Sequence, residues 1–244
     1  MKNTTIEFNG FRKEAFEFLE KLERDRYNNT EWFSKNRTIY DLHIVEPAKS
    51  FVHSISQFFN HLNPSIRTEP KFNKTLMRIN KDMRFTKGSP YRTYFLIHFG
   101  RFKMDSEFYV YLDKTGISYG LFLNNSNEQD LYLNKNIPKH KKNIIDICEK
   151  YGINKKFVLY ELHQVPEIRQ NKFDASRDFH LMSQMKYLLL EKQLGKDKKL
   201  IYTPNFLTET IKTFSRLYPL YCFSISPDPL RMVEDFDERM GIAL

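Results

Sequence analysis

Residues 107–123 read EFYVYLDKTGISYGLFL, and this stretch decides the fold. Two segments rich in aromatic and aliphatic residues, 107–113 and 117–123, flank the short connection Lys114-Thr115-Gly116. Such segments favour β-strands, and a short connection that contains glycine is typical of a β-hairpin. A similar composition predicts strands at Leu76–Asn80 and Tyr94–Phe102. We therefore predict an antiparallel β-meander whose dense apolar side chains require helices over one face.

Helical patterns lie on both sides of the predicted meander. Before it, an apolar stripe runs from Phe11 to Leu22 with Asn9 as candidate N-cap, and Thr30 is the candidate cap of a second helix. Pro47 breaks or kinks the next helical run, or occupies the first turn of a new helix. After the meander, helices are predicted at 127–136, 139–150 and 179–194 and from Thr203-Pro204 onward, and residues 157–160 are a strand candidate.

Together these elements predict an α+β fold, with an antiparallel β-meander covered by N-terminal and C-terminal helices. We predict a single domain over residues 1–244, helical at 9–63, a sheet at 72–123 and mostly helical at 127–244. This organisation is the simplest one because no internal repeat and no low-complexity linker divides the chain.

The composition argues against several classes of protein. Hydrophobic residues make up 41% of the 244 residues and aromatic residues 15%, which is unlike a disordered chain. The N-terminus has no uninterrupted apolar segment of the signal-peptide kind, and no apolar run approaches the roughly 20 residues that span a bilayer. Cys148 and Cys222 form neither a disulfide framework nor a metal-binding spacing. We therefore expect a soluble, cytoplasmic protein with no membrane partner.

The positive charge is concentrated in one segment. The net charge is +9, and residues 71–103 hold nine Lys and Arg against a single acid, Asp82. Residues 1–70 hold ten of each sign, and residues 104–244 hold twenty cations and nineteen anions. An excess spread over the whole surface affects solubility, whereas an excess confined to 33 residues indicates an anion-binding site.

The centre of this segment, residues 78–92, reads RINKDMRFTKGSPYR. Ser89-Pro90-Tyr91 is typical of a turn, and Gly88 permits backbone geometry closed to other residues. We predict that the turn brings cationic side chains together as ligands for an anion, with Asp82 as a structural ion-pair partner of lowered pKa rather than a base. The alternative is a solvated strand face with surface cations. The ligand-binding residues predicted here are Arg78, Arg84, Lys87, Ser89, Tyr91 and Arg92.

Asn28, Asn29 and Trp32 have two interpretations. They form a turn between helices with a core tryptophan, or they form a wall of the same anion site. In the second interpretation, Trp32 beside cations suits stacking on a base or a sugar.

Recognisable catalytic and metal-binding motifs are missing. None of the seven histidines pairs with another at helical spacing, and the sequence has no HExxH, GxSxG, P-loop or GxGxxG motif. We predict no metal and no cofactor, and the sequence does not decide whether the protein is an enzyme or what its oligomeric state is. Three classes stay open, and the shape of the basic segment separates them. A cleft favours an enzyme on an anionic small molecule or other phosphate-containing ligand, a long shallow surface favours weak nucleic-acid binding, and a flat patch rimmed by apolar side chains favours a protein-interaction module.

The chain resembles an uncharacterised, mainly bacterial family known as domain of unknown function 2461. The likeness rests on Asn28-Asn29-x-x-Trp32-Phe33, on Arg78-x-x-x-Asp82-x-Arg84-Phe85-Thr86-Lys87 followed by Ser89-Pro90-Tyr91-Arg92-Thr93, and on Tyr218-Pro219-Leu220. Members of the family often have one more residue, including another lysine, where this chain has only Gly88. The resemblance implies a shared fold and a shared site but no established reaction.

Overall fold

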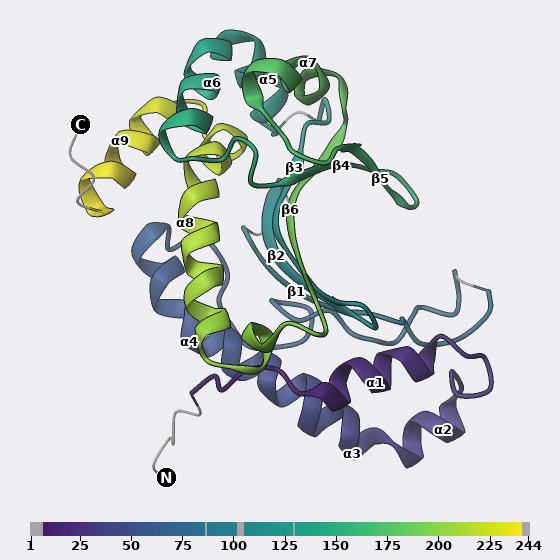
Figure 1. The fold of residues 1–244 in the computed structure, drawn as a ribbon. Helices are drawn as coiled ribbons and strands as arrows, with labels where there is room; N and C mark the ends of the chain where they lie inside the picture. The colour runs from purple at the N-terminus through teal and green to yellow at the C-terminus, as the bar shows by residue number, and fades with distance from the viewer. Residues whose placement is uncertain (1–6, 86, 102–104, 129, 241–244) are drawn as a thin grey trace. The chain divides into compact units, whose positions relative to one another are not determined.

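The computed structural model describes residues 7–85, 87–101, 105–128 and 130–240 (Figure 1). Thr86, Phe102 and Gln129, which fall within predicted segments, lie outside these residues. The chain packs into two compact units, which are described separately. Unit 1 comprises Met1–Phe99, Val110–Ser118 and Gln193–Ile211, and unit 2 comprises Gly100–Tyr109, Tyr119–Lys192 and Lys212–Leu244. The single domain expected from the sequence stays a prediction.

The strands form one six-stranded antiparallel sheet in the order β1-β2-β3-β6-β4-β5 (Figure 1). Its first three strands follow one another in the chain, as the meander predicts, and the hairpin of residues 107–123 is confirmed. Leu76–Asn80 is not a regular strand, because its residues form isolated bridges only. Leu76 pairs with Phe72 and Ile97, and Asn80 pairs with Tyr91. The strands are β1 (Phe95–Gly100), β2 (Ser106–Asp113), β3 (Gly116–Asn124), β4 (Val158–Leu162), β5 (Pro166–Gln170) and β6 (Tyr187–Gly195).

Unit 1 begins with a series of helices. These are α1 (Lys13–Leu22), α2 (Thr30–Lys35), α3 (Arg37–Tyr40) and α4 (Glu46–Leu62), with a π-helical turn at Asp41–Val45 between the last two. Pro47 lies in the first turn of α4, directly after the π-helical turn. The predicted cap Asn9 is wrong, because α1 has Arg12 at its N-cap and the Asn9 amide donates to the Glu7 carbonyl.

The core of unit 1 is built from phenylalanine rings. The ring of Phe51 on α4 lies 5.1 Å from that of Phe8 and 5.8 Å from that of Phe206, measured between centroids. Phe59, two turns further along α4, stacks on Phe99 of β1 at 4.7 Å. The N-terminal helices thus pack on the sheet through edge and stacked contacts between large rings, which bury much apolar area per residue.

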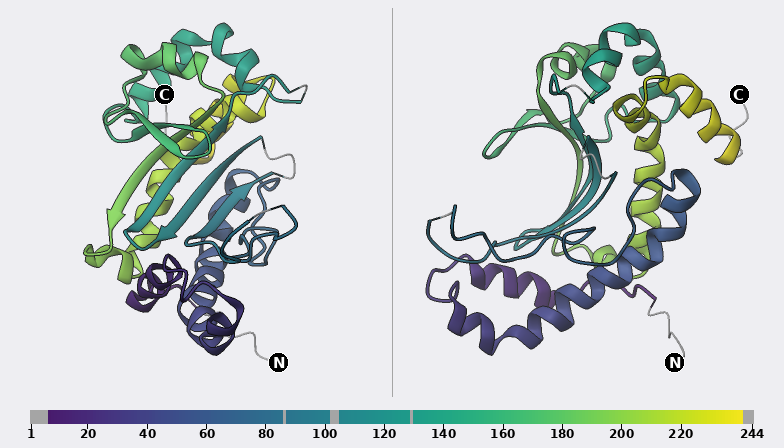
Figure 2. Two further views of the ribbon diagram at one scale, coloured as in Figure 1. Left: turned by 90° about the vertical axis from the view of Figure 1, so that its right-hand side faces the viewer. Right: turned by 180° about the vertical axis from the view of Figure 1, so that it is seen from behind.

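Unit 2 holds the C-terminal helices. They are α5 (Leu133–Lys139), α6 (Lys141–Lys150), α7 (Ala175–Gln184), most of α8 (Asn205–Ile225) and α9 (Pro229–Met240), and Figure 2 shows them from two further sides. The ring of Phe108 on β2 lies 5.0 Å from Phe214 and 4.9 Å from Tyr221, both on α8. Among the described residues, no helix is both long and apolar enough to cross a membrane.

The prediction of one helix over residues 179–194 is wrong in its second half. Helix α7 ends at Gln184, Met185 adopts an extended conformation, and β6 begins at Tyr187. The run Leu188-Leu189-Leu190 has no alternation because the strand is buried on both faces, and a short apolar run of this kind does not distinguish strand from helix. The predicted helix at 127–136 starts later, at Leu133.

Gly120 permits the close approach of β3 to β6. A Cβ atom at this position would overlap the carbonyl oxygen of Leu190 in β6. Both partners are backbone, so neither yields by a simple rotation of a side chain.

We expect Gly120→Ala to lower the free energy of unfolding by about 3 kcal/mol, because the added methyl group must separate two paired strands. Gly88→Ala is the matched control. Gly88 has a φ of +94° but open space around it, so its substitution carries only a backbone penalty of about 1 kcal/mol. Urea denaturation of both variants measures the difference, and equal losses would contradict the steric explanation.

Candidate functional site

Residues 78–92, called the basic loop from here on, form a closed hairpin-like loop in unit 1. The Lys81 N–H donates to the Pro90 carbonyl at 2.8 Å, and the Arg92 N–H donates to the Ile79 carbonyl at 2.8 Å. A bridge between Asn80 and Tyr91 lies between these two bonds. The ends of the loop are therefore held together, and among the described residues, 82–85, 87 and 88 form its outer part.

A buried asparagine fastens this loop to the N-terminal helices. Asn28 is 4% exposed, and its amide donates to the carbonyls of Leu22, at 2.7 Å, and Tyr91, at 3.0 Å. Its side-chain oxygen accepts the Tyr91 N–H at 2.9 Å. The carboxamide thus pairs with both backbone groups of Tyr91, as a neighbouring β-strand would.

Two further contacts hold the same end of the loop. The Tyr91 ring stacks on Phe33 of α2 with a centroid distance of 4.1 Å and an interplanar angle of 12°. The Ser89 hydroxyl donates to the Asp25 carboxylate at 3.0 Å. Asn28, Ser89 and Tyr91 were predicted from the sequence to bind a ligand. In the structure they attach the loop to the N-terminal helices. Whether they also contact a ligand stays a prediction.

Asn29 and Trp32 lie at the start of α2, next to the residues that hold the loop. Asn29 is the N-cap of α2, where its side-chain oxygen accepts the Trp32 N–H at 2.9 Å, so the predicted cap at Thr30 is one residue too late. The half-buried Trp32 ring lies 5.3 Å from Phe18 and 5.5 Å from Tyr27, measured between centroids. Both residues therefore serve the turn between helices, and their contact with a ligand stays a prediction.

The arginines of the basic loop have different surroundings. Arg84 donates through Nε, at 3.0 Å, and Nη2, at 2.7 Å, to the two carboxylate oxygens of Asp82. Hydrogen bonds from the Arg84 side chain and backbone hold the pKa of Asp82 below its ordinary value. Arg92 turns its guanidinium to the carbonyls of Arg78 and Asn80. The Arg78 Nε donates to the Asn73 side chain at 3.2 Å.

Apolar side chains lie at the outer part of the loop, and they are not among the residues predicted to bind a ligand. Phe85 is 84% exposed and Met83 is 45% exposed. The guanidinium carbon of Arg84 lies 5.4 Å from the centre of the Phe85 ring. An aromatic ring so exposed beside a cation makes this part of the loop a candidate contact surface. The pattern Arg84-Phe85 inside a basic segment was the available signal.

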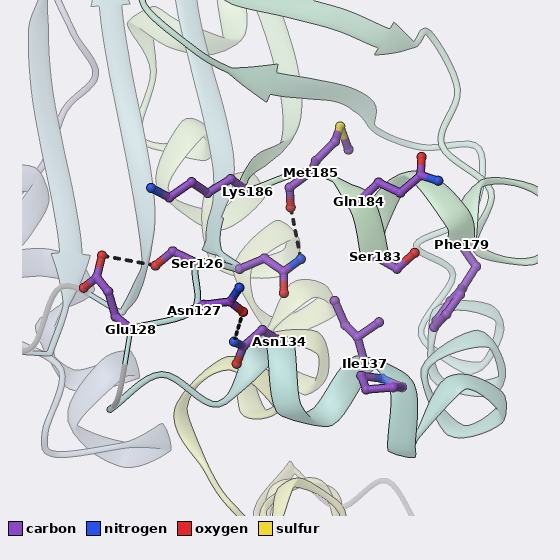
Figure 3. Close-up of a pocket in the computed structure, with 12 residues that line it drawn as sticks. Ser126, Asn127, Glu128, Asn134, Ile137, Phe179, Ser183, Gln184, Met185 and Lys186 are labelled. Atoms are coloured by element: carbon purple, nitrogen blue, oxygen red, sulfur yellow. Dashed lines mark hydrogen bonds between the residues drawn. The ribbon is translucent and has the colours of Figure 1, made fainter.

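Unit 2 contains a cavity of about 870 Å³ that no sequence pattern indicated (Figure 3). It lies between the turn after β3, helix α5 and the end of α7. None of the ligand-binding residues predicted from the sequence lines it. Its polar wall consists of Asn125, Ser126, Asn127, Glu128, Asn134, Ser183, Gln184 and Lys186, and its apolar wall of Ile137, Pro138, Phe179 and Met185. In the described part of the chain, no three His, Cys, Asp or Glu residues gather as metal ligands.

We expect Asn28→Ala to lower the free energy of unfolding by about 3 kcal/mol, because it leaves one N–H and two carbonyls buried without their partner. Asn29→Ala is the matched control at the next position, and loss of a helix cap costs about 1 kcal/mol. Urea denaturation separates the two effects. Equal losses for both variants would show that the Asn28 bonds do not hold the loop.

A comparison with protein families matches residues 14–223 to a family described as "Conserved hypothetical protein (DUF2461)". A search of curated proteins finds no match. The matched region covers most of the 244 residues and contains both the Asn28–Phe33 corner and the basic loop that the Asn28 amide joins. The family description names no reaction, ligand or partner. This chain belongs to the family of conserved hypothetical proteins that carry domain of unknown function 2461.

Proposed function

We propose that this protein binds a phosphorylated or other anionic ligand at the basic loop. The observation that supports this proposal is the placement of excess charge on a fastened loop. Residues 78–92 hold five Lys and Arg residues against one acid, and the side chain of Arg84 is 80% exposed at the outer part of the loop. Lys87 is exposed nearby. Exposed cations on a held backbone attract anions through space and bind them by charge-assisted hydrogen bonds.

The pairing of Arg84 with Asp82 suits such a role. Asp82 occupies Nε and one side of Nη2, which leaves the Nη1 donors of Arg84 for another acceptor. The carboxylate thereby orients the guanidinium instead of acting as a base. Because the pKa of Asp82 is lowered, its carboxylate stays ionised at neutral pH, and the ion pair is lost only in acid as the pH falls through that pKa.

Attachment of the loop lowers the cost of binding. The Asn28 bonds and the stacking of Tyr91 on Phe33 restrict the backbone near Ser89 to Arg92 before any ligand arrives. A site whose base is already ordered loses less conformational entropy when it binds a ligand.

A second candidate function is weak binding of single-stranded nucleic acid, and Phe85 favours it. Bases stack on exposed aromatic rings while neighbouring cations contact the phosphates. Phe85, with Arg84 beside it and Lys87 two residues on, offers both kinds of contact. A small anion would make no use of this ring, whereas an oligonucleotide would.

For the anionic ligand, we expect isothermal titration with inorganic pyrophosphate and with a nucleoside triphosphate to detect binding at low salt. The double variant Arg84→Ala/Lys87→Ala should weaken it at least about tenfold, because two charge-assisted contacts are lost. Lys139→Ala/Lys172→Ala removes two exposed lysines of unit 2 and should change affinity by less than about twofold. Equal effects of the two double variants, or no binding of either probe or of an oligonucleotide, would refute the proposal.

For nucleic acid, we expect a labelled single-stranded oligonucleotide to bind weakly at ~150 mM salt. Four cations of the loop, Arg78, Lys81, Arg84 and Lys87, predict a log–log salt slope of roughly −3, or about thirtyfold tighter binding at ~50 mM. Phe85→Ala should weaken binding about 5- to 100-fold, and Met83→Ala should have little effect. Fluorescence polarisation measures the affinity at ~150 mM salt, its dependence on salt and the change in each variant. An unchanged affinity in Phe85→Ala, with the pyrophosphate result intact, would favour the small anion.

A further inference from the structure

We infer that the cavity of unit 2 is a second binding site, which takes a neutral, hydroxyl-rich molecule of the saccharide type. The cavity has a volume of about 870 Å³, within the range of small-molecule sites. It is independent of the basic loop, since none of its lining residues belongs to residues 78–92. The inference rests on three properties of its walls, namely their attachment, their charge and their unfilled hydrogen-bonding capacity.

The walls are attached to one another by side-chain amides. The Asn125 amide donates to the carbonyls of Met182, at 3.1 Å, and Met185, at 3.0 Å, and its backbone N–H donates to Lys186 at 2.8 Å. The turn after β3 is thereby joined to the end of α7. On the other side, the Asn134 amide donates to the Asn127 side chain at 2.7 Å, which joins α5 to the same turn (Figure 3). The cavity is therefore formed before any ligand binds.

The lining carries no net charge, which disfavours a strongly charged ligand. The lining contains one carboxylate, Glu128, and one ammonium group, Lys186. Its other polar groups are four carboxamides and two hydroxyls. A carboxamide donates and accepts at once, as does a hydroxyl, so the two groups match each other in hydrogen bonding. This lining contrasts with the basic loop, where cations prevail.

Two amide oxygens of the lining lack a partner. The side-chain oxygens of Asn125 and Asn134 are buried and have no hydrogen-bond partner within the described residues. Turning the Asn125 amide over would break its two bonds to the carbonyls of Met182 and Met185, so the oxygen stays an unfilled acceptor. Both oxygens are closed off from water, so a ligand O–H donor reaches them only after a small rotation of the amide toward the cavity, which relieves the cost of a buried acceptor without a donor.

The apolar part of the lining suits the other surface of a sugar ring. In Figure 3, Ile137 and Phe179 lie on the opposite side of the group from Ser126, Asn127 and Glu128. A saccharide has hydroxyls at its edge and C–H groups on its faces, so it meets both kinds of wall. A flat aromatic anion or a long aliphatic chain would satisfy only one of them.

The test is saturation-transfer NMR on the full chain with a panel of neutral sugars and polyols, namely glucose, galactose, N-acetylglucosamine, maltose and glycerol, each at about 5 mM, a concentration that exceeds a Kd of about 1 mM. We expect at least one sugar to give a signal that does not change between ~50 and ~500 mM salt, because no net charge is involved. Gln184→Trp should reduce the signal at least about fivefold by filling the cavity. Gln57→Trp, at an exposed position on α4 in unit 1, is the matched control and should leave it unchanged.

The outcomes separate this inference from the proposed function. Absence of signal for the whole panel, or a signal that Gln184→Trp leaves intact, overturns the site. The same NMR experiment is run with zwitterionic glycine and glutamine, and a signal from either of them with none from any sugar overturns the ligand class. Arg84→Ala/Lys87→Ala must leave the sugar signal unchanged, and thermal unfolding of Gln184→Trp at the wild-type temperature verifies that its fold is intact.

Discussion

The basic loop depends on the pairing of the Asn28 carboxamide with the backbone of Tyr91. This pairing supplies buried partners for an N–H and a carbonyl that would otherwise have none, and the third bond of Asn28 fixes the end of α1. Burial of all three bonds makes them costly to break. A loop whose cations repel one another is thus held by neutral contacts at its base, which leaves charges such as Arg84 and Lys87 facing water.

Local patterns identified the elements that local interactions determine. The hairpin at 107–123 was predictable because its turn and both strands are adjacent in sequence. Strand β6 was not, because the residues that make Leu188–Leu190 a strand are its neighbours in the sheet, β3 and β4. Gly120 leaves room for the carbonyl of Leu190, but its role cannot be read from the sequence until β3 and β6 are known to be neighbours.

For the candidate sites, too, the sequence indicated what depends on neighbouring residues but not what depends on residues far apart in the chain. Charge along the chain located the basic loop, and the resemblance named Asn28 and Tyr91. That these two residues bond to each other across 63 positions of sequence was not predictable, so both were taken as ligand contacts. The cavity of unit 2 combines short polar pieces from three segments. Each piece, such as Asn125-Ser126-Asn127, looks like an ordinary turn when it is considered alone.

The strand order has a consequence for synthesis on the ribosome. Strand β6 is the last strand to be translated, yet it lies between β3 and β4 in the sheet. Until residues 187–195 emerge, β3 and β4 each present an edge without its final partner, while the apolar side chains of 107–123 are already made. Unpaired edges promote association between chains. We therefore expect chains that have not yet completed β6 to associate with one another more readily than the full chain.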